Sequence, residues 1–163
     1  MRLSVPYTGL ILSTRERPSF RRELLELGIS QISAGSKVNP GGYTSKEATE
    51  QFEVGDSRSL DEVVRELVEN DFIPSFCTGC YRSGRVGKDF MDLAKPGLIK
   101  EYCKPNAMFT FREYLEDYAS PETKAKGLAL LKQLTQTFSK EELKKRVEGN
   151  LCKIGEGERD LYF

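Results

Sequence analysis

The sequence predicts an α/β fold in which the C-terminal part of a β/α (TIM-type) barrel, with about three parallel strands, is followed by a helical C-terminal domain. Residues 1–76 alternate short apolar runs with amphipathic helices, which implies parallel strands joined by right-handed crossovers. Residues 77–163 begin with a cysteine-containing loop and continue with helical periodicity. Three strands cannot close a barrel, so the first part is completed by other chain segments or is a small open α/β sandwich.

The N-terminal elements follow from apolar runs and the glycines between them. The first strand is expected within residues 5–13, because residues 10–12 are all apolar, as in strands covered on both faces. A helix over residues 17–27 should end at Gly28, a natural C-terminal cap. A second strand is expected over residues 29–33.

A long polar connection over residues 34–58 comes next, and connections of this length are usually functional or act as lids. Ser59 and Glu62 form a capping box that starts the following helix, and Asn70 can end it in a left-handed turn. Residues 71–76 then have the pattern of a third strand, directly before the cysteine loop.

The C-terminal part is expected to hold one short helix and three longer ones. Cys103 stands two residues before Pro105, and we expect helical structure to stop there, because a proline disfavours helix at the residue before it. Ser120 should cap the second long helix, and Ser139 with Glu142 forms a capping box for the third. The expected helices cover residues 88–94, 109–118, 121–138 and 140–151, and residues 152–163 are expected to be an arm.

Composition restricts the possible chemistry. A chain of 163 residues can form one domain with a core, and its 25 basic residues balance 25 acidic ones, so no net charge points to nucleic acid or a membrane. No apolar run is long enough to span a bilayer and no signal-peptide pattern is present, which favours a soluble, cytoplasmic protein. The absence of histidine excludes His-ligated zinc, His bases and Ser-His-Asp triads within the chain.

Three of the four cysteines, Cys77, Cys80 and Cys103, form a C-x2-C-x22-C set. Two thiolates on one tight turn make half a metal site, and a third leaves one coordination position open. This pattern favours a [4Fe–4S] cluster with three irons held by thiolates and the fourth free. Zinc with a fourth ligand and a redox dithiol remain alternatives, and Cys152 is expected to be an unligated, partly buried thiol.

Basic side chains flank the cysteine loop. Arg82 and Arg85 would offset the negative charge of thiolates and sulfides at such a cluster. The alternative is that both belong to a solvated basic loop without a ligand.

The loops after the first two strands carry candidate substrate contacts, because active groups of β/α barrels lie at the C-terminal ends of strands. Ser13, Thr14 and Arg15 follow the first strand, and Ser33 and Ser36 follow the second. Hydroxyls and a guanidinium suit the carboxylate and amine of an amino acid. Hydroxyl side chains after a strand are also often helix caps, and Arg15 could pair with a nearby glutamate.

Several stretches resemble known families. Residues 5–16 and 28–36 are similar to the last barrel strands of the tyrosine-cleaving radical SAM enzymes, a segment called the biotin and thiamin synthesis-associated domain. Residues 77–87, 90–91 and 103–107 resemble the C-terminal extension of the HydG family of [FeFe]-hydrogenase maturases. The resemblance covers nearly the whole chain, and the thiamin-pathway tyrosine lyase lacks the three-cysteine extension.

The resemblance implies a function. HydG-type enzymes use SAM and an N-terminal [4Fe–4S] cluster to cleave tyrosine to p-cresol and dehydroglycine. An auxiliary [4Fe–4S] cluster then converts dehydroglycine to carbon monoxide and cyanide for the hydrogenase H-cluster, on an extra iron held by cysteine at the open position. Carried over to this sequence, the auxiliary cluster would be bound by Cys77, Cys80 and Cys103. The implied partners are dehydroglycine, cysteine, iron and other hydrogenase maturation proteins.

The resemblance also implies a limit. The C-x3-C-x2-C motif that binds the radical SAM cluster is absent from this sequence, so we expect a C-terminal fragment that does not cleave tyrosine by itself. Two further hypotheses are a non-catalytic zinc- or iron-binding module and a homo-oligomer formed through the open barrel edge.

Overall fold

The computed structural model of the chain describes residues 3–4, 6, 8–44 and 52–163. It divides into two compact units, Met1–Val63 and Val64–Phe163. Two short strands lie in the first unit, and the second unit is helical. In the described part of the chain, none of the helices has the length and apolar composition needed to cross a bilayer.

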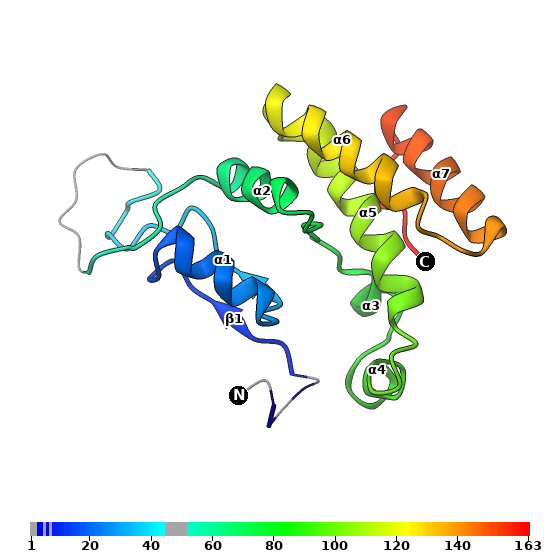
Figure 1. The fold of residues 1–163 in the computed structure, drawn as a ribbon, viewed down its shortest axis with the longest axis horizontal. Helices are drawn as coiled ribbons and strands as arrows, with labels where there is room; N and C mark the ends of the chain where they lie inside the picture. The colour runs from blue at the N-terminus through cyan, green and yellow to red at the C-terminus, as the bar shows by residue number, and fades with distance from the viewer. Residues whose placement is uncertain (1–2, 5, 7, 45–51) are drawn as a thin grey trace. The chain divides into compact units, whose positions relative to one another are not determined.

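The first unit contains a two-stranded parallel sheet and a crossover helix (Figure 1). Strand β1 (Ile11–Leu12) pairs in parallel with β2 (Gln31–Ile32). Between them lies α1 (Pro18–Glu26), which begins with a proline where a missing N–H costs no hydrogen bond. After α1, Gly28 has a φ of 97°, in the left-handed region that favours glycine. The predicted parallel pairing, crossover helix and glycine cap are confirmed.

The sheet is smaller and less covered than the sequence predicted. The first expected strand, residues 5–13, is reduced to two paired residues, and residues 5 and 7 lie outside the described part. Ile11 is 72% exposed, so β1 is not a strand covered on both faces. An apolar run becomes a covered strand only where another layer packs on it. The described residues form a two-stranded sheet and not a barrel.

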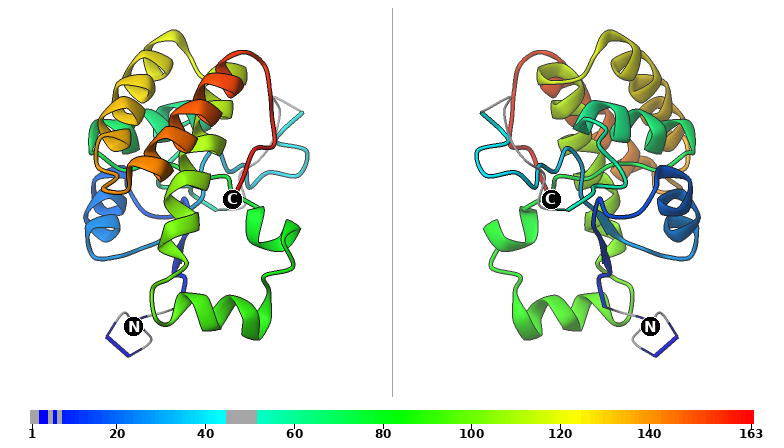
Figure 2. Two further views of the ribbon diagram at one scale, coloured as in Figure 1. Left: turned by 90° about the vertical axis from the view of Figure 1, so that its right-hand side faces the viewer. Right: turned by 90° about the vertical axis from the view of Figure 1, so that its left-hand side faces the viewer.

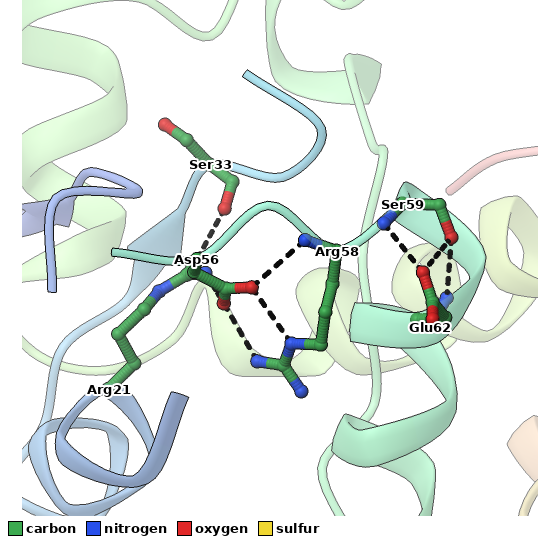
Figure 3. Close-up of polar contacts among 6 residues, drawn as sticks. All are labelled: Arg21, Ser33, Asp56, Arg58, Ser59 and Glu62. Carbon is green, nitrogen blue, oxygen red and sulfur yellow. Dashed lines mark hydrogen bonds and ion pairs between the residues drawn. The ribbon is translucent and has the colours of Figure 1, made fainter. Parts of the chain in front are cut away.

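Helix α2 (Leu60–Glu69) begins with the predicted capping box (Figure 3). The N–H and the hydroxyl of Ser59 donate to the Glu62 carboxylate over 2.8 and 2.7 Å. In return, the N–H of Glu62 donates to the Ser59 hydroxyl over 3.3 Å. These bonds satisfy backbone donors that the first turn of a helix leaves without partners.

The end of α2 corrects one prediction. Asp71, rather than Asn70, is the left-handed residue, with a φ of 60°. The N–H of Phe72 donates to the Leu67 carbonyl over 2.9 Å, which closes a Schellman motif around Asp71. Aspartate tolerates this conformation because its short polar side chain can bond locally.

Residues 71–76, predicted to be a third strand, pair with no strand in the described part of the chain. The N–H of Phe76 donates instead to the Thr110 hydroxyl over 3.2 Å. A strand needs a neighbour for its backbone bonds, and here a side chain supplies one of them.

The second unit is built around its longest helix, as Figures 1 and 2 show. That helix packs against the two that follow it, and it contributes more buried residues to the core than any other element. After the last residues of α2, the helices of this unit in chain order are α3 (Gly79–Arg82), α4 (Gly87–Ala94), α5 (Lys100–Asp117), α6 (Pro121–Thr135) and α7 (Glu141–Gly155). The fully buried core side chains include Met108, Phe109, Phe111 and Leu115 of α5 and Val147 and Ile154 of α7.

Helix α5 continues through Pro105, so the predicted stop at Cys103 is wrong. Pro105 removes one N–H that would bond to the Glu101 carbonyl, and a proline inside a helix costs about 3 kcal/mol. Residues 105–109 are all buried, and burial of each large apolar side chain contributes about 1.5–3 kcal/mol. Packing of this run therefore outweighs the local preference against helix.

The start of α6 was predicted correctly and the start of α7 was not. The Ser120 hydroxyl accepts the N–H of Thr123 over 3.3 Å, as a helix cap does. At α7 the capping residue is Lys140, which makes no side-chain capping bond, so the box expected from Ser139 and Glu142 is not formed. Helix α6 ends at Thr135, three residues before the predicted end.

The last residues of the chain are not the arm that their composition predicted. Helix α7 extends to Gly155, beyond the predicted end at residue 151. Leu161 and Phe163 then pack against the core of the second unit. The composition of this segment is dominated by charged residues and glycine, so it did not reveal that these two apolar side chains are partly buried.

Candidate functional site

Cys77 precedes a short helix and Cys80 lies within it, and hydrogen bonds satisfy backbone groups at both ends of this helix. Cys80 is the second residue of α3, and the N–H of Gly79 donates to the Cys77 sulfur over 3.3 Å. Gly84, with a φ of 68°, ends the helix in a Schellman motif. In this motif the Arg85 N–H donates to the Cys80 carbonyl over 2.8 Å. The backbone therefore fixes the spacing of the two thiols.

Cys103, in the first turn of α5, interacts with both of these thiols. Cys77 and Cys80 are half-buried, and Cys103 is exposed. Partial loss of hydration raises the pKa of the Cys103 thiol, Cys80 and Cys77 raise it further, and the Arg85 guanidinium lowers it. The grouping of the three cysteines in one site stays a prediction.

The arrangement of these donors can be compared with what a metal group requires. Among the described residues, no three His, Cys, Asp or Glu side chains converge closely enough to hold one metal ion. Thiolate ligands of a single zinc ion lie about 2.3 Å from a common centre. In a [4Fe–4S] cluster each thiolate binds an iron at a different corner, so the sulfur atoms lie farther apart. The described residues therefore contain no preformed site for a single metal ion.

Arg85 lies between the cysteine loop and α5. Its Nη2 donates to the Phe163 carbonyl over 2.8 Å, and its guanidinium lies 4.8 Å from the centre of the Tyr102 ring. Its Nε is buried and has no hydrogen-bond partner within the described chain. A buried unpaired donor is costly, so this N–H is suited to an acceptor bound at the loop.

Arg82 contacts the C-terminal segment. Its Nη1 donates to the Asp160 carboxylate over 2.8 Å, and its guanidinium lies 4.9 Å from the centre of the Tyr162 ring. The hydrogen bond to Asp160 raises the pKa of Arg82. Arg82 and Arg85 thus both have specific partners in the chain. A solvated basic loop would have left both side chains in water.

Cys152 lies outside this set, on α7. It is exposed, which corrects the expectation of a partly buried thiol. Its thiol donates to the Glu156 carboxylate over 3.4 Å, and this bond raises the pKa of Cys152.

In the first unit, Thr14 and Ser33 lie at the same end of the two-stranded sheet. Thr14 follows β1 and is 5% exposed, and its carbonyl accepts the N–H of Asp56 over 2.9 Å. Ser33 follows β2, and its N–H donates to the Leu12 carbonyl over 3.0 Å. The Ser33 carbonyl accepts a bond from the Arg21 guanidinium. The backbone groups of both residues are therefore held in place.

The other strand-end candidates have more local surroundings. The Ser13 hydroxyl accepts the N–H of Arg15 over 3.4 Å, as in a turn. The Arg15 guanidinium lies 5.3 Å from the centre of the Phe52 ring. Ser36 is half-buried at the beginning of the long connection.

A buried ion-pair network that sequence reasoning missed ties the long connection to the sheet (Figure 3). The Asp56 carboxylate accepts bonds from the Arg21 guanidinium and from Nε and Nη2 of Arg58, the latter two over 2.9 and 2.8 Å. The Arg21 and Asp56 side chains are 3% and 0% exposed. The hydrogen bond from Arg58 lowers the pKa of Asp56 from its ordinary 3.8 to about 2, although burial opposes this.

The sequence held only part of the signal for this network. Arg21 and Asp56 are 35 residues apart, and no spacing rule connects an amphipathic helix with a polar connection. The local signal is the Asp-x-Arg order of Asp56 and Arg58, because an aspartate often bonds to the backbone N–H two residues later. That bond is present, over 3.2 Å.

Comparison with known sequences gives related proteins for the first half of the chain. Residues 1–73 match the Biotin and Thiamin Synthesis associated domain. The 2-iminoacetate synthase of Escherichia coli (strain K12) is 40% identical over 74 residues, which cover 45% of this chain and 20% of that protein. The 2-iminoacetate synthase of Salmonella typhimurium is 43% identical over 67 residues, or 40% of this chain and 18% of that protein.

Comparison with solved structures covers nearly the whole chain. The crystal structure of HydG, a maturase of the [FeFe]-hydrogenase, matches with a TM-score of 0.92 and 48% identity over 99% of this chain and 35% of that chain. HydG from Carboxydothermus hydrogenoformans matches with a TM-score of 0.65 and 39% identity over 92% of this chain and 31% of that chain. In sequence and fold the chain is similar to HydG, a maturase of the [FeFe]-hydrogenase, and it spans about a third of the length of these two structures.

Proposed function

We propose that this chain is the auxiliary-cluster-binding portion of a HydG-like maturase, and that Cys77, Cys80 and Cys103 each bind one iron of a [4Fe–4S] cluster. One observation carries the proposal: the chain contains the C-x2-C-x22-C set and is 48% identical to HydG over 99% of its length. The N–H of Gly79 donates to the Cys77 sulfur over 3.3 Å, and bonds of this kind stabilise a thiolate bound to iron.

The fourth iron would have no cysteine ligand from the set. When bound, such a cluster supplies an iron with a free position for a small ligand or for a further iron carried by cysteine. The buried, unpartnered Nε of Arg85 would donate to an acceptor at this site, and its positive charge would offset the charge of thiolates and sulfides. The substrates would be tyrosine-derived dehydroglycine, cysteine and iron, and the products carbon monoxide and cyanide for the hydrogenase H-cluster.

We place this chemistry in the cytoplasm, where reducing conditions keep thiols free for metal, and together with other hydrogenase maturation proteins. The first unit would contribute strands to a β/α barrel, with Thr14 and Ser33 at its catalytic end. Tyrosine cleavage would need the radical SAM cluster, whose C-x3-C-x2-C motif this sequence lacks.

The test is anaerobic reconstitution with iron and sulfide, followed by metal and sulfide analysis and EPR with and without added cysteine. We expect about four irons per chain, a reduced-cluster signal that changes on adding cysteine, and loss of the cluster in Cys77→Ala, Cys80→Ala and Cys103→Ala. Cys152→Ala is the matched control and should leave the signal unchanged. A cluster that survives all three substitutions would refute the proposed ligands.

A different outcome would favour the structural alternative. Protein purified without added metal would then contain one zinc ion per chain, and the metal would be insensitive to air. In that case Cys103→Ala should lower the thermal stability of the loop without any redox signal being lost.

A further inference from the structure

The last four residues, Asp160–Phe163, form a segment that we name the tail strap. Its Asp160 carboxylate accepts a bond from Arg82 of the cysteine loop over 2.8 Å. Its Phe163 carbonyl accepts a bond from Arg85, also of that loop, over 2.8 Å. The tail strap is therefore tied to the loop at both of its ends.

The tail strap is tied equally to α5. The N–H of Phe163 donates to Oδ1 of Asn106 over 2.8 Å, and the N–H of Asp160 donates to the Glu113 carboxylate over 2.6 Å. The Phe163 ring stacks on Phe109 with 5.6 Å between ring centres. Phe109 and Asn106 are 0% and 2% exposed, so the strap is anchored on buried residues of α5.

The loop, the tail strap and α5 meet at Gly79. A Cβ at this glycine would lie 3.1 Å from Nδ2 of Asn106, 3.4 Å from the Cys77 sulfur and 3.6 Å from Cβ of Tyr162. These distances leave little space for any side chain at position 79. The cysteine turn is thus seated directly against Asn106 and the strap.

This arrangement joins the two segments that carry the cysteines. Cys77 and Cys80 belong to the loop, and Cys103 stands one helical turn before Asn106 on α5. A displacement of the strap would release Arg82 and Arg85 and free the loop to move relative to Cys103. A ligand set on two segments holds its geometry only when both are fixed.

We propose that the tail strap and Asn106 are positioning elements of the cysteine site, which hold Cys77 and Cys80 at a set separation from Cys103. The inference rests on the proposed function in that it assigns the three thiols to one site. It goes further in assigning a role to residues outside the C-x2-C-x22-C set.

The first experiment measures thiol separation in the metal-free protein. In a Cys77→Ser, Cys152→Ser background only Cys80 and Cys103 remain, and dibromobimane becomes fluorescent when it bridges two thiols. We expect Asn106→Leu, which keeps the volume but loses the bonds, and deletion of residues 160–163 to slow bridging about tenfold. Asn106→Asp keeps the acceptor for the Phe163 N–H and should restore most of the rate.

Two further variants separate positioning from folding. Thr135→Val removes a buried hydroxyl that donates to the Leu131 carbonyl over 2.7 Å, and it lies on α6 rather than on the loop, α5 or the tail strap. It should lower the melting temperature and leave bridging unchanged. Asp160→Asn is exposed and retains a residue that tolerates a φ of 63°, so it should fold normally and slow bridging about two- to threefold. Unchanged bridging in Asn106→Leu, the deletion and Asp160→Asn would overturn the proposal.

The second experiment uses the reconstituted protein and follows loss of cluster absorbance in an iron chelator. The same variants should lose the cluster about tenfold faster than the Thr135→Val control. Equal rates in all of them would also overturn the proposal. If the unsubstituted protein takes up no cluster, the proposed function fails, and the bridging rates still decide whether the strap positions the thiols.

Discussion

Asp56→Asn should loosen the first unit while leaving the second unit intact. The Asp56 carboxylate accepts bonds from Arg21 and from three donors of Arg58. Asparagine at this position keeps one acceptor oxygen but points an NH2 group at guanidinium donors. Because the Arg21 side chain is 3% exposed, its charge would remain buried without an anion.

The magnitude follows from this burial. Removing one partner of a buried ion pair typically costs 3–5 kcal/mol, and the oxygen that asparagine retains places the expected cost near about 3 kcal/mol. A change of this size shifts the local opening equilibrium about 100-fold. The opening should be confined to segments bound to the network, which are the end of β1, the end of β2 and the long connection.

Hydrogen exchange followed by mass spectrometry measures this directly. We expect amides in peptides that cover residues 10–15 and 29–36 to exchange about 100-fold faster in Asp56→Asn, and amides of α5 to be unchanged. Glu62→Gln is the matched control, because it removes one carboxylate from the same unit but keeps an acceptor for the capping box. Equal protection in Asp56→Asn and the unsubstituted protein would refute the assigned role of the network.

Three further predictions use the same structure. Because the pKa of Asp56 is lowered to about 2, its contribution of about 2 kcal/mol is complete above pH 4 and is lost as the pH falls towards 2. Pepsin should then cut the first unit faster, relative to the second, as pH falls through this window, and less so in Asp56→Asn. Gly127→Ala should lower the free energy of unfolding by about 1–3 kcal/mol in urea titrations, because its Cβ would lie 2.6 Å from Leu115. Gly149 has open space around it, so Gly149→Ala should raise the free energy of unfolding by about 0.5–1 kcal/mol. Glu156→Gln should lower the pKa of Cys152 and so speed its alkylation by iodoacetamide at pH 8, with Lys153→Gln as a control that leaves the rate unchanged.

Local signals predicted those parts of the fold that depend on local chemistry. Gly28 ends α1 and the Ser59 capping box starts α2, because each satisfies helix-terminal groups within a few residues of sequence. The parallel pairing of β1 and β2 was predictable since a crossover helix separates them. The caps depend on residues a few positions apart, and the paired strands are consecutive strands of one β-α-β unit.

The predictions that failed depend on distant partners. Residues 71–76 have the composition of a strand, but the described chain supplies a Thr110 hydroxyl instead of a neighbouring strand. The terminal residues have the composition of an arm, but Phe163 meets Phe109 and Asn106. The composition of a segment limits which local structures it can form, and its tertiary contacts decide which of these structures it adopts.

In the candidate site, too, local patterns could be predicted from the sequence and contacts between distant residues could not. The spacing of Cys77, Cys80 and Cys103 groups them on chemical grounds, because few chemistries need three thiols in that order, and this grouping stays a prediction. The Arg21–Asp56 pair was not predictable, since it joins a helix to a connection 35 residues away. Charged residues are common on helix surfaces, so neither residue stood out from its neighbours.

The wrongly predicted stop at Pro105 bears most directly on the site. Because α5 is continuous, Cys103, Asn106 and Thr110 follow one another at i, i+3 and i+7 and lie on one face of the helix. Two of them meet the cysteine loop or the residue before it: Asn106 lies against Gly79, and Thr110 accepts the Phe76 N–H. Had the helix stopped at Cys103, that cysteine would have been on a separate turn with no fixed register to the loop. The burial of residues 105–109 that carries the helix through the proline therefore also sets the position of the third thiol.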